Sequence, residues 1–344
     1  MKKTSEVLLL FTGGTISMSE NYETGALSPV DFDHLQKYIP ELSIIGVKTT
    51  SIPLLPLIDS SDIMPDLWKR LAHIIEENYN NYDGFVILHG TDTMAYTASA
   101  LSFMLENLSK PVILTGSQLP IGVMRTDAKE NLLTAIEIAA AKENNQSIVP
   151  EVCIFFEDTL FRGNRTTKRS TEHFNAFKSH NYPLLAQAGV HIKYFRSYIK
   201  YPHDGIKLRV KTKIDTNIAI LKIFPGITQD CVEAILNIRN LKAVILESFG
   251  TGNAPRIEWF YAAVKEATER GVLIINRSQC STGAVEMGRY ETSLNLLSAG
   301  VMSAHDCTIE AITTKLMCVL GECTSIDDVK HHLNMSVCGE MTVG

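Results

Sequence analysis

Two turns that contain glycine and threonine, each directly after an apolar run, restrict the fold of this chain most strongly. Thr12-Gly13-Gly14-Thr15 follows the apolar residues 7–11, and His89-Gly90-Thr91-Asp92-Thr93 follows the apolar residues 84–88. In an open α/β sheet, ligands bind in the crevice outside the carboxyl ends of the strands. We therefore expect both turns to bring hydroxyl groups and one carboxylate to a single crevice. Those groups suit nucleophilic attack on a carbonyl better than the binding of a phosphate.

The order of apolar and helical patterns predicts an α/β fold. Apolar runs such as 84–88 alternate with helix-period segments such as 93–108, and nearly continuous apolar runs are typical of parallel strands buried on both faces. The alternation stops over residues 191–212, which are rich in Lys, Arg, Tyr and His, and then resumes. We predict a larger N-terminal catalytic domain over 1–190 with a doubly wound, mostly parallel sheet. A linker over 191–212 and a second, smaller C-terminal α/β domain over 213–344 complete the prediction.

Charge, hydropathy and cysteine content exclude several partner classes. The net charge of -6 argues against nucleic acid, which needs a basic surface. No apolar run approaches the ~20 residues that a membrane span requires. The seven cysteines are scattered without a CxxC pair, which fits a reducing compartment and argues against a structural zinc site. We expect a soluble, cytoplasmic protein that binds neither nucleic acid nor membrane.

The two turns offer a nucleophile and a carboxylate. Thr15 can act as a nucleophile only if a base or a hydrogen-bond relay activates its hydroxyl. Asp92 has two interpretations: it caps the helix that begins near Thr93, or it binds an ammonium group of a substrate. His89 has no second ligand at helical spacing, so a hydrogen-bonded core position is favoured over a metal site.

Two further segments have both a structural and a functional interpretation. Asp59-Ser60-Ser61-Asp62 is either a loop that caps a helix or a site that binds a carboxylate through hydroxyls and backbone N–H groups. The basic run over 162–169 is either a solvated face or another crevice loop. In the second case a buried lysine can relay protons, because desolvation shifts the pKa of lysine readily.

Several motifs, in order along nearly the whole chain, resemble the bacterial-type L-asparaginases. The clearest are Thr12-Gly13-Gly14-Thr15-Ile16 and residues 84–93. Three others are residues 59–62, 110–118 and 250–255. The run 162–168 and Cys280 resemble the cytoplasmic type I branch of that family.

The resemblance implies an amidohydrolase that converts L-asparagine to L-aspartate and ammonia without a metal or an organic cofactor. It makes Thr15 the primary nucleophile, which forms a covalent β-aspartyl ester. It assigns Thr91, Asp92 and Lys168 to a second triad, in which Lys168 tunes Thr91. Asp92 would also bind the α-ammonium group of the substrate.

The resemblance also implies the residues that bind the substrate. Asp59, Ser60 and Ser61 match the loop that binds the α-carboxylate and the amine. Asn253 lies where the family brings a residue from a neighbouring subunit toward the active site. A homodimer or a homotetramer, built as a dimer of dimers, is therefore expected.

One departure concerns the loop after the nucleophile. The family usually places a tyrosine there, beside the active threonine. The position reached from Thr15 without gaps is Ala26, and Tyr22 is the nearby tyrosine that can take its place.

A second departure concerns regulation. Some type I enzymes have an arginine directly before a Ser-aromatic-Gly segment, in an allosteric asparagine site that includes the matching cysteine. Here Glu247 precedes Ser248 and Phe249, with Cys280 as the cysteine. A carboxylate there reverses the local charge, so we expect weaker cooperativity.

Other functions compete with this one. The same fold can serve a glutaminase or another amidohydrolase. A catalytically silent amino-acid sensor is disfavoured because Thr15, Thr91, Asp92 and Lys168 are all present. An amidotransferase subunit is disfavoured because no appended module is evident, and a dinucleotide-binding domain because the GxGxxG fingerprint is missing.

Overall fold

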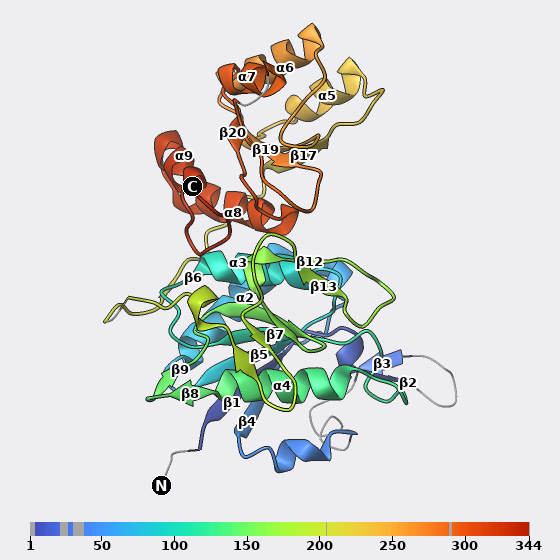
Figure 1. Cartoon of the computed structure of the whole chain (residues 1–344), viewed down its shortest axis with the longest axis vertical. Helices are drawn as coiled ribbons and strands as arrows, with labels where there is room; N and C mark the ends of the chain where they lie inside the picture. Colours follow the sequence, from blue (N-terminus) through green and yellow to red (C-terminus); the bar gives the residue numbers. More distant parts are fainter. Residues whose placement is uncertain (1–3, 21–26, 30–37, 204, 289–290, 344) are drawn as a thin grey trace. The chain divides into compact units, whose positions relative to one another are not determined.

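The chain forms two compact units, Met1–Thr212 and Lys213–Gly344 (Figure 1). The computed structural model describes residues 4–20, 27–29, 38–203, 205–288 and 291–343. Each unit has its own sheet and its own apolar core, as the α/β prediction requires. Within these described residues, no helix is long and apolar enough to cross a membrane.

The main sheet of the first unit is mostly parallel. Its order is β15-β14-β11-β10-β7-β5-β1-β4. The strands are β1 (Glu6–Phe11), β4 (Lys48–Pro53), β5 (Gly84–Leu88), β7 (Val112–Thr115), β10 (Val152–Phe156), β11 (Thr159–Arg162), β14 (Ala186–Gln187) and β15 (Lys193–Tyr194). The strands from β4 to β10 are parallel to one another, and those from β11 to β15 add antiparallel pairs. All residues of β5 and β10 are buried, which explains their uninterrupted apolar sequences.

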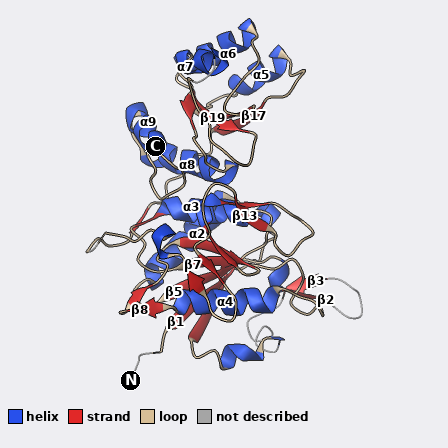
Figure 2. Cartoon of the chain, viewed as in Figure 1, coloured by secondary structure: helices blue, strands red, loops and turns tan. Residues whose placement is uncertain are grey.

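Helices cover both faces of this sheet. They are α2 (Pro65–Asn78), α3 (Met94–Met104) and α4 (Ala128–Ala140). Helices α2 and α3 lie on one side of the strands and α4 lies on the other (Figures 1 and 2). Helix α3 is buried nearly all round. Its small side chains allow the backbone at Gly163 to approach closely, since a Cβ added at Gly163 would lie 3.0 Å from the Ala98 Cβ.

Helix α3 is shorter than the predicted helix over 93–108. It ends at Met104, because the next residues form β6 (Leu105–Glu106), which pairs with β16 (Arg209–Val210). Asn107 then has a φ of 62°, a left-handed conformation that is incompatible with continuing a right-handed helix.

The segment 191–212, predicted as a linker, lies in the first unit. Strand β15 extends the main sheet, and β16 pairs with β6. Both strands are only two residues long, which is too short to leave a periodic apolar pattern in the sequence. The boundary between the units follows Thr212.

Shorter elements complete the first unit. They are the strand pairs β2 (Met18–Glu20) with β3 (Leu27–Pro29), β8 (Lys142–Glu143) with β9 (Gln146–Ser147) and β12 (Thr166–Lys168) with β13 (Phe177–Ser179), and the 3-10 turns η1 (Thr15–Ser17), η2 (Pro40–Ser43), η3 (Ser60–Asp62), η4 (Gly163–Arg165) and η5 (Arg196–Tyr198). The β12–β13 hairpin stands apart from the main sheet.

The second unit is a smaller α/β layer structure. Its sheet has the order β17-β18-β19-β20, with all neighbours parallel. The elements are β17 (Ile218–Lys222), α5 (Gln229–Leu236), β18 (Ala243–Ser248), α6 (Glu258–Glu269), β19 (Leu273–Ser278), α7 (Glu291–Ser298), β20 (Met302–Ser303), α8 (Ile309–Glu322) and α9 (Ile326–Asn334). Along β18, Val244 packs with Phe260 of α6 on one face, and Ile245 packs with Leu316 of α8 on the other. Because side chains alternate between the two faces of a strand, successive residues of β18 enter different apolar cores.

Candidate active site

The Thr12–Thr15 turn ends β1 and lies against the end of β5. Both the backbone N–H and the hydroxyl of Thr12 donate to the Leu88 carbonyl at 3.0 Å. Gly13 and Gly14 have φ values of 124° and 83°, which favour glycine. A Cβ at Gly13 would collide with the backbone of Ile58, and one at Gly14 with the backbone of Gly90. The two glycines therefore allow the Thr12–Thr15 turn to contact both the loop at Ile58 and the turn at Gly90.

The second predicted turn meets the first at its glycine. A Cβ added at Gly90 would lie 3.3 Å from the Gly14 Cα and 2.6 Å from the Ser60 Oγ. Thr15 and Thr91 each directly follow a glycine of this contacting pair. The structure therefore brings the two predicted turns into contact at Gly14 and Gly90.

Lys168 reaches the second turn from β12. Its Nζ donates to the Thr91 Oγ1 at 2.7 Å and to the Asp92 Oδ1 at 2.6 Å. The Lys168 side chain is only 15% exposed, whereas that of Asp92 is 60% exposed. The ammonium group is thus held inside the site, and the carboxylate still faces solvent on one side. The structure therefore brings Thr91, Asp92 and Lys168 together.

Asp92 does not cap the helix that follows it. The N-cap of α3 is Thr93, and no side chain forms a capping hydrogen bond there. The Thr93 hydroxyl instead donates to the Ser60 carbonyl at 2.6 Å and fastens the third loop to the second turn. Of the two interpretations of Asp92, the capping one is wrong.

The Asp59–Asp62 segment forms the short turn η3. The Asp59 carboxylate caps it, accepting from both the backbone N–H and the hydroxyl of Ser61 at 2.8 Å. These two hydrogen bonds hold the pKa of Asp59 below its usual value, and the one from the backbone N–H has the larger effect. Ser60 is buried against the Gly90 turn, while Asp59 and Ser61 are exposed. The capping interpretation is confirmed, and the loop lies beside the two turns as a binding loop would.

His89 is a core residue, as predicted. It is fully buried, and burial lowers its pKa to about 4. Trp68 Nε1 donates to the Thr97 hydroxyl at 3.0 Å, so that hydroxyl can donate to His89 Nε2 at 2.8 Å. His89 Nδ1 then donates to the Gly90 carbonyl at 2.6 Å. The neutral ring therefore links the core to the glycine that contacts Gly14.

The basic run before Lys168 is not a solvated face. Arg162, Asn164 and Arg165 are 4%, 0% and 2% exposed. Arg162 forms a bidentate ion pair with Glu151, with N–O distances of 2.6 and 3.1 Å. Sequence reasoning missed this pair because basic runs are usually solvated.

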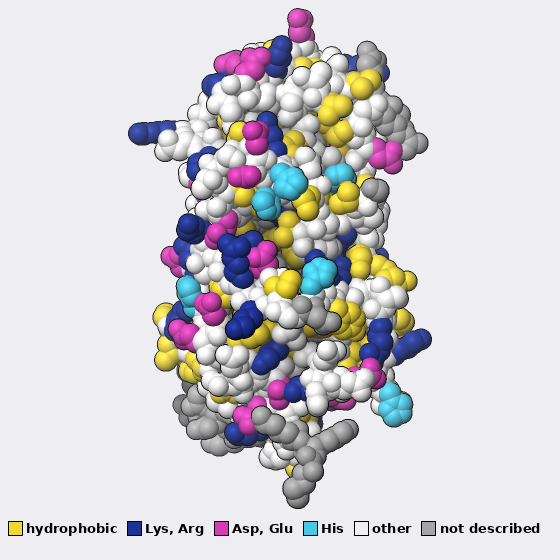
Figure 3. Space-filling view, turned by 90° about the vertical axis from the view of Figure 1, so that its left-hand side faces the viewer, with side chains coloured by type: hydrophobic (Ala, Val, Ile, Leu, Met, Phe, Trp, Pro, Cys, Tyr) yellow, Lys and Arg dark blue, Asp and Glu magenta, His cyan; other side chains and the backbone are white. Residues whose placement is uncertain are grey.

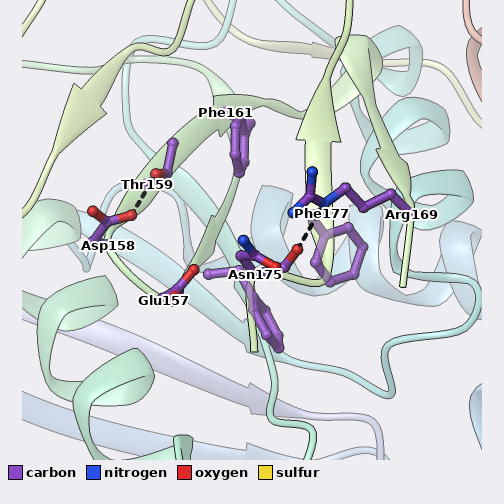
Figure 4. Close-up of a pocket in the computed structure, with 8 residues that line it drawn as sticks. Glu157, Asp158, Thr159, Phe161, Arg169, Asn175 and Phe177 are labelled. Atoms are coloured by element: carbon purple, nitrogen blue, oxygen red, sulfur yellow. Dashed lines mark hydrogen bonds between the residues drawn. The ribbon is translucent and has the colours of Figure 1, made fainter. Parts of the chain in front are cut away.

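A cavity of about 350 Å³ lies beside the hairpin that carries Lys168 (Figure 4). Arg169, the next residue along, lines it, and its Nε donates to the Asn175 carbonyl at 3.1 Å. The other lining residues are Phe156, Glu157, Asp158, Thr159, Phe161 and Phe177. Burial, and then the neighbouring Asp158, raise the pKa of Glu157. This cavity is distinct from the Lys168–Thr91–Asp92 contacts.

The residues predicted for regulation lie at strand ends of the second unit. The Glu247 carboxylate is paired with Arg277 at 2.5 Å and lies 3.9 Å from Lys222 Nζ. These partners occupy the same level of the neighbouring strands β19 and β17. The charge of Glu247 is therefore balanced within the sheet, which the sequence analysis did not foresee.

The other residues of this group surround the same strand ends. The Ser248 hydroxyl donates to Asn276 Oδ1 at 2.5 Å. Phe249 and Asn253 exchange two backbone hydrogen bonds in the loop after β18. Cys280 is exposed, and its N–H donates to the Ser278 hydroxyl at 3.0 Å.

Two predicted positions cannot be placed. Tyr22 and Ala26 lie outside the described residues. Within the described ranges, no group of three or more His, Cys, Asp or Glu side chains is placed to hold a metal ion.

Comparisons with known proteins cover both units. Residues 6–200 match the domain family described as Asparaginase, N-terminal, and residues 217–333 match the Glutaminase/Asparaginase C-terminal domain. The chain is 43% identical over 346 residues to L-asparaginase 1 of Escherichia coli strain K12, with 99% of each chain covered.

Solved structures agree with this match. L-asparaginase I from Vibrio cholerae superposes with a TM-score of 0.89 at 40% identity, covering 99% of this chain and 100% of that one. The thermostable L-asparaginase from Thermococcus kodakarensis gives 0.90 at 32% identity, covering 98% and 100%.

Proposed function

Because this chain belongs to the asparaginase family, we propose that it hydrolyses L-asparagine to L-aspartate and ammonia. The observation that carries the proposal is the position of Lys168 Nζ, in hydrogen-bond contact with both Thr91 and Asp92. That contact lies at the turn that meets the Thr15 turn, which supports a site in which a nucleophile and a proton-transfer group lie close together.

The reaction has two halves. The Thr15 hydroxyl loses its proton and its oxygen attacks the side-chain carbonyl carbon of asparagine. The carbon–nitrogen bond breaks, the nitrogen leaves as ammonia with the proton, and a β-aspartyl ester remains on Thr15. Water then attacks the ester, releasing aspartate and restoring the threonine hydroxyl.

Thr91, Asp92 and Lys168 form the proton-transfer group in this proposal. Lys168 donates to the Thr91 oxygen, which leaves the Thr91 proton free to take part in a relay. This relay activates either Thr15 or the attacking water. Backbone N–H groups of the glycine turns are available to stabilise the oxyanion.

Substrate binding is assigned to the two neighbouring segments. Asp92, whose side chain is 60% exposed, keeps an oxygen for the α-ammonium group. Asp59, Ser60 and Ser61 bind the α-carboxylate and the amine from the adjoining loop. Asn253 completes the site from a neighbouring subunit, which makes the working form a homodimer or homotetramer.

The remaining assignments rest on the sequence. Tyr22 serves as the lid residue in place of Ala26. Glu247, Ser248, Phe249 and Cys280 form the counterpart of the family's allosteric site. Its cooperativity is weak, because Arg277 is already paired with Glu247.

The protein is proposed to act in the cytoplasm, without a metal or an organic cofactor. All seven cysteines are present as thiols. Acidic and basic side chains are interspersed on the face that Figure 3 shows, which fits a protein without a nucleic-acid surface.

An ammonia-release assay with L-asparagine and L-glutamine over a range of concentrations tests the proposal. We expect turnover of asparagine, with kcat/KM about 10–200-fold higher than for glutamine, the range that one methylene commonly gives. A higher kcat/KM for glutamine would make the protein a glutaminase. The absence of turnover with both would favour an amino-acid sensor, and EDTA is expected to change neither rate.

A further inference from the structure

Lys168 must be placed accurately although its strand is weakly supported. Its Nζ contacts two different side chains, so a small shift of the backbone breaks both contacts. Strand β12 has three residues and pairs with β13 outside the main sheet. Besides its pairing with β13, Lys168 depends for support on the residues before it.

The segment before Lys168 leaves the main sheet at Arg162, the last residue of β11. The turn η4 that follows is packed tightly, since a Cβ at Gly163 would lie 3.0 Å from both the Ala98 Cβ and the Val152 carbonyl. The buried Thr166 hydroxyl donates back to the Arg162 carbonyl at 2.7 Å. Arg162 is thus the fixed point from which the chain reaches Lys168.

Arg162 is itself held by a buried network. Its guanidinium is paired with Glu151 and also donates to the Tyr198 carbonyl at 2.9 Å. Its Cζ lies 4.3 Å from the centre of the Tyr182 ring, and Arg165 stacks on the same ring at 5.1 Å. The Lys200 N–H donates to the Glu151 carboxylate at 2.5 Å. Both charges are satisfied from several directions.

We propose that the buried Glu151–Arg162 pair is a positioning device that sets the distance between Lys168 and Thr91, and so the rate of turnover. This inference rests on the proposed function for its kinetic readout. A buried ion pair adds little stability compared with apolar residues of similar volume. A misplacement of 1 Å at a catalytic group, by contrast, can lower a rate about 10²-fold. The pair therefore acts on geometry more than on stability.

The second unit supplies a matched control. Lys315 of α8 and Glu340 are also paired, at 2.6 Å, and both side chains are fully buried. Lys315 Nζ donates to the Met335 carbonyl as well. This pair carries the same kind of charge burial, but it lies in the other compact unit.

The test compares two double variants, R162M/E151M and K315M/E340M, by kcat, KM and Tm. For R162M/E151M we expect kcat for asparagine to fall about 10- to 100-fold with KM changed less than about threefold. For K315M/E340M we expect kcat within about twofold of the unmodified protein, whatever its Tm, when assayed well below that Tm. The single variant Arg162→Lys keeps the charge but loses the bidentate contact, so it should lower kcat by an intermediate factor.

Equal losses of kcat in the two double variants, following Tm, would overturn the positioning role. A crystal structure of R162M/E151M gives a readout that does not depend on activity. The Lys168 Nζ–Thr91 Oγ1 separation should exceed its value of 2.7 Å, and an unchanged separation would also overturn the proposal. Failure of the unmodified protein to hydrolyse asparagine would refute the proposed function, and the crystallographic result would still decide the inference.

Discussion

The two units use the ends of their parallel strands in different ways. In the second unit, the polar groups at the ends of β18 and β19 bind one another: Ser248 donates to Asn276, and Ser278 donates to the Gly250 carbonyl. In the first unit, Thr91 and Asp92 are contacted by Lys168, a side chain from a separate hairpin.

The difference distinguishes the proposed reaction site from the strand-end loops of the second unit. Similar glycine-containing loops follow the strands in both units, so the fold alone does not decide their chemistry. In the first unit, the amino group of Lys168 is brought against the Thr91 hydroxyl. In the second unit, the Ser248 hydroxyl bonds to a side chain of the next strand and the Ser278 hydroxyl bonds to the loop after β18.

The largest effect is expected from removing the ammonium group at this contact. Lys168→Met keeps the side-chain stem and removes the charge, so kcat should fall about 10²–10⁴-fold, the contribution typical of positioned proton transfer. Lys178→Met, an exposed position on the paired strand β13, is the control and should leave kcat within about twofold. Steady-state ammonia release measures both, and equal kcat values for the two variants would remove Lys168 from the relay.

Features formed by adjacent residues could be predicted from the sequence, and features formed by distant residues could not. The Thr15 and Thr91 turns were predictable because strand, glycine and hydroxyl are adjacent in the sequence. The burial of Arg162 was not, because it depends on Glu151 and on contacts with Tyr182 and Tyr198.

The environment of Glu247 was hidden for a similar reason. Lys222 and Arg277 become its neighbours only through the register of parallel strands, which a local pattern does not reveal. The strands of 191–212 were missed because a strand of two residues leaves no periodic signal. Motifs formed by adjacent residues can be predicted from a sequence, whereas ion pairs between residues far apart in the sequence cannot.

A smaller effect is expected on stability, from His89. Its pKa is about 4 in the folded protein, below the usual value of 6.5, so the unfolded state takes up the proton first as pH falls. This contribution to stability is complete above pH 6.5 and is lost between about pH 6.5 and 4, by roughly 3 kcal/mol. Chemical denaturation at several pH values should show a weaker pH dependence for His89→Gln.

His73 provides the control for this prediction. It is exposed on α2, so His73→Gln should change the free energy of unfolding at pH 7 by less than ~0.5 kcal/mol, as surface substitutions usually do. If His89→Gln and the unmodified protein lose stability in parallel between pH 6.5 and 5, the buried neutral ring is not responsible.

The smallest effect is expected at the strand ends of the second unit. Because the Arg277 guanidinium is paired with Glu247, it is not available for the carboxylate of an effector, and the rate curve for asparagine should be near-hyperbolic. Glu247→Gln releases the guanidinium and should increase sigmoidality slightly. A strongly sigmoidal curve for the unmodified protein would show that the second unit regulates by other groups.

The most direct test of the central claim is to trap the covalent intermediate. Rapid acid quenching during turnover of asparagine, followed by peptide mass spectrometry, should reveal a β-aspartyl ester on Thr15, and the Thr15→Ala variant should show neither the adduct nor turnover. An adduct on Thr91, or full turnover by Thr15→Ala, would contradict the assignment of Thr15 as the nucleophile.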